Sequence, residues 1–455
     1  MGTEVDLVVV GTAYHAPRSD RLDVLIDVAI GVDASGVISD VVPVADARGQ
    51  ELLRSATRVK RLRPSERLLP GLIDTHIHAP QWPQLGTGLD LPLEEWLFAY
   101  TFPLEARYAD EVFADRVWRH MVPSLLAHGT TTAVYFSSIH EGATRRLAEV
   151  CGEAGQRAFV GRVAMDHPEG TPDWYRDASV SEGVDASARS IDDVLEAGGG
   201  PSRVRPIVTP RFVPACTDDL LRGLGELAAS TGQIVQTHCS ESDWAHGYVI
   251  ERFGHTDSEV LDGFGLLRES TVLAHADHLT DGDMDRVRAR QAGVAHCPLS
   301  NSYFANAVFP LRRALDRGLR VGLGSDVAGG PTVGLLPQCS HAVTVSRMLE
   351  DGVDPGRSSS DRGVAESRID TVTAFHVATA GGAELLGIPV GSFEVGRKFD
   401  AFSVDVETPG SALRRWDEVD TEKRLFEKIV RVAGSNDITN VWVDGRRVAG
   451  RVDDA

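Results

Sequence analysis

The segment that decides the fold is Pro70-Gly-Leu-Ile-Asp-Thr-His-Ile-His78. Its apolar start and alternating end predict a buried strand, Leu72–Ile77, with His76 and His78 on one face. Seven similar segments follow it along the chain: Thr131–Phe136, Ala158–Ala164, Val204–Thr209, Ile234–Thr237, Thr271–Ala274, Gly293–His296 and Val321–Gly324. Helical patterns lie between them, at Asp110–Ala127, Asp218–Ala229, Asp281–Gln291 and Pro310–Asp316. Eight strands alternating with helices predict an α/β fold, a closed (β/α)8 TIM-type barrel.

Both ends of the chain are rich in strand-like segments instead. The segments near the N-terminus are Val5–Val10, Val24–Ile30 and Gly36–Val42, and those near the C-terminus are Phe399–Val404 and Val441–Val448. β-branched runs separated by Gly, Asp and Pro are typical of short strands. We therefore expect a small β-sandwich domain built from residues 1–66 and 395–455, beside a barrel at residues 67–394. We also expect a surface helix and loop at Ser181–Ser202 and an exposed loop at Asp354–Arg362.

The composition excludes several classes of protein. The chain has 455 residues and a formal net charge of −20, which disfavours binding to nucleic acids and to anionic membranes. No apolar run is long enough to span a membrane. The cysteines are few, odd in number and scattered, at Cys151, Cys216, Cys239, Cys297 and Cys339. That pattern favours a reducing compartment, and the acidic N-terminal residues do not resemble a signal peptide, so we expect a cytoplasmic protein.

Polar side chains stand at the ends of several predicted barrel strands. His76 and His78 end the first strand, His238 ends the fifth, His275 ends the sixth and Asp326 follows the eighth. Any one of them taken alone is more often a structural residue than a ligand. Because the C-terminal ends of barrel strands meet at one mouth, the five side chains can converge. Nitrogen ligands with one carboxylate suit zinc, or iron in a similar geometry, so the sequence predicts a metal site.

The lysines indicate one metal ion rather than two. A two-metal site needs a bridging ligand, often a modified lysine on a barrel strand. The lysines of this chain all lie outside the eight predicted strands, at Lys60, Lys398, Lys423 and Lys428. The predicted fourth strand offers no other bridging group. We therefore expect a single ion.

Three further residues near the predicted mouth have open roles. Glu241 lies three residues beyond His238, where it could be a loop or helix-cap carboxylate, or a proton shuttle beside metal-activated water. His296 ends the seventh strand and could be core, a support for the site or substrate-facing. His278 lies just past His275 and could support the site.

Further segments, in one order along the chain, resemble a known family. Three segments resemble the amidohydrolase superfamily. They are the opening segment Pro70–His78, Gly324-Ser-Asp326 and Phe393-Glu-Val-Gly-Arg-Lys-Phe-Asp400. A second set resembles its guanine deaminase family: His78-Ala-Pro-Gln81, Leu91-Pro-Leu-Glu-Glu-Trp-Leu97, Tyr100-Thr-Phe-Pro103, Gly129-Thr-Thr-Thr132, Gly155-Gln-Arg-Ala-Phe-Val-Gly161, Val208-Thr-Pro-Arg-Phe212 and Ala295-His-Cys-Pro298. The resemblance implies a homodimeric enzyme of purine catabolism. It would hydrolyse guanine to xanthine and ammonia with one zinc ion per subunit.

The same resemblance implies roles for particular residues. His76, His78, His238 and Asp326 would bind the metal, and His275 would bind it or orient its water. Gln81 and Arg211 would contact the polar edge of the purine and Phe212 its face, with His238, Glu241 and Asp326 also at the substrate. Glu241, Asp326 and His275 would be catalytic, Glu241 protonating the ring and Asp326 carrying a proton to the departing amine. The long, aromatic segment Gln81–Phe102 is a plausible cover over the site.

Three places depart from the family pattern. Leu299 replaces a small or polar residue, residues 302–308 lack a usual glycine, and Gly330-Pro331-Thr332 replaces a turn that carries serine. The departures leave open a related aminoheterocycle as substrate, such as 8-oxoguanine, a pterin or an aminotriazine. A barrel that has lost catalysis and serves as a scaffold is a further alternative, although such a protein is expected to lose ligands. This chain keeps all five predicted ligands and Glu241.

Overall fold

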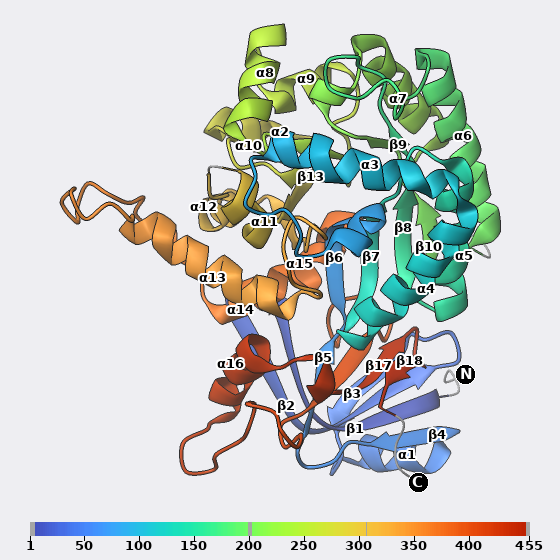
Figure 1. The fold of residues 1–455 in the computed structure, drawn as a ribbon. Coiled ribbons are helices and arrows are strands. Elements are labelled where there is room, and N and C mark those ends of the chain that lie inside the picture. Colours follow the sequence, from blue (N-terminus) through green and yellow to red (C-terminus); the bar gives the residue numbers. More distant parts are fainter. Residues whose placement is uncertain (1–4, 199–202, 306, 452–455) are drawn as a thin grey trace.

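The computed structural model describes residues 5–198, 203–305 and 307–451. It consists of a barrel and a sheet that lies beside one end of the barrel (Figure 1). The barrel strands are β6 (Leu72–His78), β7 (Thr130–Phe136), β8 (Arg157–Gly161), β10 (Val204–Pro206), β12 (Gln236–Cys239), β13 (Val272–His275), β14 (Gly293–His296) and β15 (Arg320–Leu323). They confirm the eight predicted strands.

The eight strands form a closed parallel ring. Their order is β10-β8-β7-β6-β15-β14-β13-β12, and neighbours pair in parallel. The ring closes where Val208, just after β10, bridges to Val235, just before β12. A further short pair, β9 (Val163–Ala164) and β11 (Thr209–Pro210), extends two strands toward the mouth. All eight strands therefore end on the same side, as the site prediction requires.

Helices surround the ring, and the predicted helices are among them. They are α4 (Glu111–Ala127), α5 (Glu141–Ala154), α6 (Val180–Ala197), α7 (Asp218–Thr231), α8 (Asp243–Phe253), α9 (Asp257–Gly263), α10 (Asp281–Ala289), α11 (Pro298–Phe304), α12 (Leu311–Asp316), α13 (Leu336–Asp351), α14 (Thr371–Val377) and α15 (Ala380–Leu386), with a 3-10 turn η4 (Val213–Ala215). The helix expected in Ser181–Ser202 is α6, and residues 199–202 of that prediction lie outside the described residues. The segment Asp354–Arg362 is an irregular, exposed loop as predicted.

Local sequence explains where these helices begin and end. Asp110 begins α4 by accepting hydrogen bonds from the backbone amides of Val112 and Phe113. Thr217 caps α7 in the same way through its hydroxyl oxygen. Gly232 ends α7 with φ of 69°, a left-handed conformation that favours glycine. Capping satisfies backbone groups that a helix terminus otherwise leaves without partners.

Strands from both ends of the chain join in one mixed sheet. Its elements are β1 (Val5–Arg18), β2 (Arg21–Asp33), β3 (Ile38–Pro43), β4 (Arg58–Arg61), β5 (Glu66–Pro70), β16 (Ala401–Asp405), β17 (Ile438–Val443) and β18 (Arg446–Gly450), with α1 (Ala47–Ser55), α16 (Glu422–Val432) and the 3-10 turn η5 (Ser435–Asp437). In the order β18-β17-β16-β5-β1-β2-β3, the C-terminal strands meet the N-terminal strands where β16 pairs with β5, and β4 pairs with β1. We call this the terminal sheet. A sandwich of two facing sheets, and domain limits at residues 66 and 395, stay predictions.

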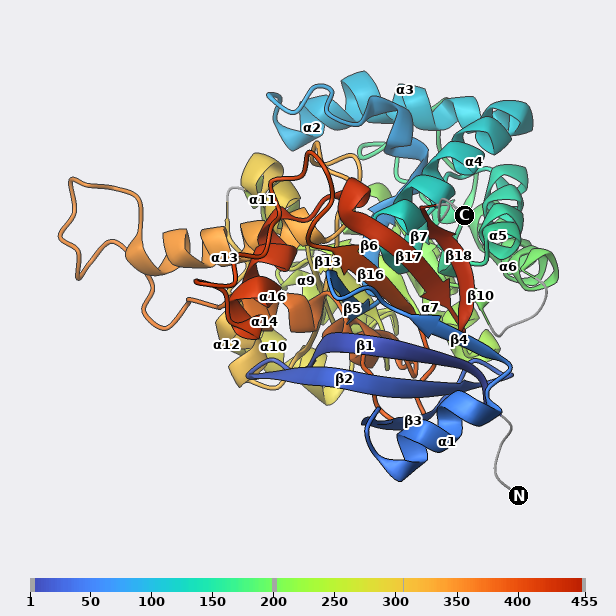
Figure 2. The ribbon, with the colours of Figure 1, turned by 90° about the horizontal axis from the view of Figure 1, so that it is seen from below.

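Two segments lie outside the layers (Figures 1 and 2). The cover segment runs from β6 to α4 and contains η1 (Ala79–Gln84), α2 (Leu93–Trp96), the π-helix η2 (Leu97–Thr101), α3 (Phe102–Glu105) and η3 (Ala106–Ala109). Helix α13 and the loop after it project away from the rest of the molecule in both views. Within the described residues, no helix has the length and apolar character needed to cross a membrane.

Candidate active site

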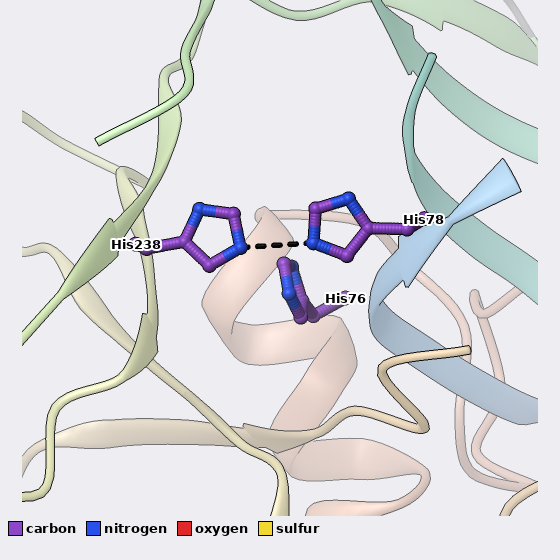
Figure 3. A group of neighbouring side chains, drawn as sticks. All are labelled: His76, His78 and His238. Carbon is purple, nitrogen blue, oxygen red and sulfur yellow. Dashed lines mark hydrogen bonds between the residues drawn. The ribbon is translucent and has the colours of Figure 1, made fainter. Parts of the chain in front are cut away.

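Three histidine rings meet at the C-terminal mouth of the barrel. His76 and His78 come from the end of β6 and His238 from β12, and the rings point toward one another (Figure 3). Nε2 of His78 and Nε2 of His238 are 2.9 Å apart. Burial lowers the pKa of all three imidazoles, which favours the neutral form that binds metal ions.

The outer ring nitrogens of two histidines are held by hydrogen bonds. Nδ1 of His238 lies 2.6 Å from the backbone oxygen of Arg211, to which it donates. Nδ1 of His275 lies 2.8 Å from Oδ1 of Asn301, whose amide nitrogen donates to Asp277. Because Nδ1 carries the proton in each ring, Nε2 keeps a free lone pair facing the mouth.

Asp326 completes the cluster from the loop after β15. One carboxylate oxygen, Oδ1, lies 3.1 Å from Nε2 of His76 and 3.6 Å from Nε2 of His78. The other, Oδ2, lies 4.0 Å from Nε2 of His275. Burial acts to raise the pKa of Asp326, but the surrounding histidines outweigh it and hold the pKa below its usual range. Asp326 is therefore an anion, fit both to bind a cation and to accept a proton.

The donor set fits a divalent metal ion. The ring nitrogens of His76 and Nε2 of His275 are buried without a hydrogen-bond partner among the described residues. The nitrogens of His76, His78 and His238 lie within 4.8 Å of one another. Buried polar atoms without partners are rare, and three converging imidazoles with a carboxylate are a common zinc set. The predicted ligands thus come together. The four lysines, which could bridge two metal ions, lie instead on or near the terminal sheet, at β4, α16 and residue 398.

Glu241 lies beside this cluster, in the loop between β12 and α8. Its Oε1 is 3.5 Å from Nε2 of His275. The cap of α8 is Ser242, whose side chain accepts from the amide of Ala245, so Glu241 is not the capping residue. Burial raises the pKa of Glu241, with a smaller contribution from the charge of Asp326. Two neighbouring carboxyl groups are therefore shifted in opposite directions, which suits one to donate a proton and the other to accept one.

A cavity opens above these residues. Its lining comprises His78, Gln81, Leu93, Trp96, Leu97, Arg211, Phe212, His238, Glu241, Phe304, Asp326 and Gly329. The cover segment supplies Leu93, Trp96 and Leu97 to the apolar lining. The ring centroids of Trp96 and of Phe304, which lies in α11, are 5.1 Å apart. Aromatic side chains together with a few polar groups suit a planar heterocycle. Gly329 is required here, because a Cβ atom would lie 2.6 Å from Oδ2 of Asp326.

One polar side of the cavity is held by a carboxylate that sequence reasoning missed. Glu105, the last residue of α3, accepts two hydrogen bonds from Arg211, at 2.6 Å and 3.1 Å. It also accepts from Nε2 of Gln81 at 3.2 Å and from the hydroxyl of Tyr175 at 3.0 Å. The guanidinium of Arg211 lies over the ring of Phe102, 4.9 Å from its centroid. The only available signal was proximity in sequence, because Glu105 follows the segment Tyr100–Pro103 by two residues.

The remaining predicted residues divide between the site and its surroundings. Phe212 lines the cavity, and its ring packs edge-on against His238. His76 and His275 are buried within the cluster and do not line the cavity. His296 packs against Phe309, and burial lowers its pKa to about 3. His278 stacks on the ring of His246, away from the cluster.

Two of the three departures from the family pattern touch each other. A Cβ atom on Gly330 would lie 2.8 Å from Cδ2 of Leu299. A side chain at position 330 would therefore require Leu299 to move. Neither residue lines the cavity, whereas Phe304, from the third departing segment, does. Residue 306 of that segment lies outside the described residues.

Comparisons with known proteins cover nearly the whole chain. A model of the amidohydrolase family matches residues 67–448. A probable guanine deaminase of Schizosaccharomyces pombe is 38% identical over 97% of this chain and 83% of its own length. A guanine deaminase of Dictyostelium discoideum is 32% identical over 96% of this chain and 97% of its own. The crystal structure of guanine deaminase from C. acetobutylicum, with guanine bound in its active site, matches with a TM-score of 0.84 at 28% identity, covering 97% of this chain and 99% of that one.

Proposed function

This chain belongs to the amidohydrolase family, and from that premise we propose that it hydrolyses guanine to xanthine and ammonia. One observation carries the proposal: Gln81 and Arg211 stand in the same cavity wall as His78, His238 and Asp326. The guanidinium of Arg211 suits the oxygen of a lactam, and the amide of Gln81 offers both a donor and an acceptor. A guanine ring bound by these groups would place its amino-bearing carbon toward the histidine cluster.

The family is metal-dependent, and we propose one zinc ion, with iron as the alternative. His76, His78, His238 and Asp326 would hold it, and His275 would bind it or orient water. When bound, such an ion supplies Lewis acidity and lowers the pKa of water toward 7. The unpartnered nitrogens of His76 and His275 support this assignment.

The protein groups then move two protons. Asp326, an anion, accepts a proton from the attacking water as its oxygen bonds to the amino-bearing carbon. Glu241, whose pKa is raised by burial, donates a proton to a ring nitrogen and makes that carbon a better acceptor. Asp326 next passes its proton to the amine, and the carbon–nitrogen bond breaks. The ring nitrogen keeps its proton, and Glu241 recovers a proton from the hydroxyl group left on the attacked carbon. Guanine and water thus yield xanthine and ammonia with both carboxyl groups restored.

The cellular setting is part of the proposal. We propose a cytoplasmic homodimer that acts in purine catabolism and binds a small purine rather than a nucleic acid. The cysteines are all free and buried, which supports a reducing compartment. Light scattering on the purified protein at several concentrations measures the oligomeric state directly.

Ammonia release by the zinc-loaded protein tests the proposed reaction. The panel comprises guanine, 8-oxoguanine, cytosine, adenine, a pterin and an aminotriazine, with chelator-treated protein as the control. We expect guanine to react far faster than the rest and the treated protein to recover when zinc is restored. If guanine does not react and another heterocycle does, the site belongs to a related deaminase. If no compound reacts, the protein is a scaffold.

A further inference from the structure

The carboxylate of Glu105 contacts Gln81 and Arg211, two polar residues that line the cavity. It is 1% exposed and accepts four hydrogen bonds, two from Arg211, one from Gln81 and one from Tyr175. Glu105 lies on the cover segment, whereas Arg211 follows β11 and Tyr175 precedes α6. The carboxylate therefore joins the cover to the barrel at the place where substrate is expected to bind.

The first consequence concerns charge. Arg211 is buried, and a buried guanidinium without a counter-ion attracts anions strongly. Paired with Glu105 through two parallel bonds, it adds no net charge to the wall. Each terminal nitrogen of Arg211 carries two hydrogens and uses one on Glu105, so hydrogen atoms remain for a ligand. The wall can therefore donate to a neutral carbonyl oxygen without selecting for an anion.

The second consequence concerns orientation. The amide oxygen of Gln81 accepts from the backbone amide of Ala328 at 3.2 Å, and its nitrogen donates to Glu105. A carboxylate cannot donate a hydrogen bond, so the amide cannot rotate by 180° without placing two acceptors together. The donor and acceptor sides of Gln81 are thus fixed before a ligand arrives.

We propose that Glu105 is a positioning residue that sets the preference of this cavity for neutral oxopurines over anionic ones. It acts by cancelling the charge of Arg211 and by fixing the amide of Gln81, and it does not touch the reacting atoms. The proposal rests on the proposed deamination of guanine, a neutral lactam. It also predicts weak binding of urate, which has a similar shape but is an anion at neutral pH.

The test compares Glu105→Gln with a matched control, Glu422→Gln. Glu422 also pairs with a buried arginine, Arg67, and a tyrosine, Tyr14, but in the terminal sheet. For Glu105→Gln we expect KM for guanine to rise about tenfold or more with a smaller change in kcat. Inhibition by urate should strengthen about tenfold in the same variant, because the guanidinium is left without its counter-ion. Glu422→Gln should leave both constants within about twofold.

A second variant and a binding measurement make the outcome decisive. Glu105→Asp keeps the charge, so it should retain the guanine-over-urate preference even if overall activity falls. An unchanged preference in Glu105→Gln, or a shift toward urate in Glu105→Asp, would overturn the proposal. If the wild type fails to deaminate guanine, the proposed function fails by itself. Calorimetric binding of urate to wild type and to Glu105→Gln still decides the role of Glu105, since urate binding needs no turnover.

Discussion

Two groups in different parts of the molecule are each built from one arginine, one glutamate and one tyrosine. The mouth triad is Arg211, Glu105 and Tyr175, and the sheet triad is Arg67, Glu422 and Tyr14. In both, a glutamate accepts two hydrogen bonds from a buried arginine and one from a tyrosine hydroxyl.

The triads differ in what else the arginine contacts. In the sheet triad, Nη1 of Arg67 donates to the backbone oxygens of Pro64 and Glu66, so the guanidinium is enclosed by protein. It joins β5 and β1 to the start of α16. In the mouth triad, Arg211 lines the cavity beside Gln81. The glutamates differ as well: the side chain of Glu105 is 1% exposed, whereas that of Glu422 is 22% exposed and also accepts a hydrogen bond from Arg415. What marks the mouth triad as a candidate binding group is that its arginine lines the cavity.

The largest effect is expected at Glu241, which shares the mouth but belongs to neither triad. Glu241→Gln keeps the shape of the side chain and removes its proton-donating carboxyl group. We expect kcat for guanine to fall about 10²–10⁴-fold with little change in KM. The melting temperature should stay the same or rise, because a buried acid is replaced by a neutral group. A small loss of rate with a lower melting temperature would place Glu241 among the structural residues.

The same substitution in each triad should give opposite results. Lysine keeps the charge but cannot form two parallel bonds to a carboxylate. Arg211→Lys should raise KM for guanine about tenfold or more, whereas Arg67→Lys should leave KM within about twofold and lower the melting temperature. Steady-state kinetics and thermal unfolding of both variants measure the contrast. Equal effects on KM would remove the distinction between the triads.

The smallest effect is expected in how the free energy of unfolding depends on pH, through Glu422 of the sheet triad. Burial acts to raise the pKa of Glu422, but hydrogen bonds from Arg67 and Tyr14 outweigh it and lower the pKa from 4.5 to about 2. A depressed pKa stabilises the folded state above pH 4.5, and this stabilisation is lost as the pH falls toward 2. Urea unfolding should therefore show wild type more stable than Glu422→Gln at neutral pH, with the difference vanishing in acid. A difference that persists at low pH would show that the charge of Glu422 is not its cause.

The barrel could be predicted because each of its strands is encoded locally. The apolar run before His76 and the alternation through His78 are visible within nine residues, and the other strands repeat that pattern. The terminal sheet was predicted less completely. Strands β4 and β5 were missed, since neither shows a long β-branched run. How β5 pairs with β16 depends on contacts between residues more than 300 positions apart.

The meeting of the histidines and Asp326 could be predicted because these residues follow strands that are themselves encoded locally. His238 and His275 stand at strand ends and Asp326 follows one closely, so barrel geometry brings them together. Glu105 has no such local marker: its partner Arg211 lies 106 positions away, and a glutamate on a short helix resembles many surface residues. The close approach of Leu299 and Gly330 has no local marker either, because a contact between separate segments is a property of the folded chain.

In the proposed reaction, Gln81 and Arg211 recognise the oxo group of guanine beside the histidine cluster. The most direct test compares kcat/KM of the metal-loaded wild type for guanine and for 2-aminopurine, which has the same amino group but no oxygen at position 6. A wall built to hydrogen-bond that oxygen should favour guanine by about 10³-fold or more, because its buried donors stay unpaired with the analogue. Similar constants for the two purines would contradict the account.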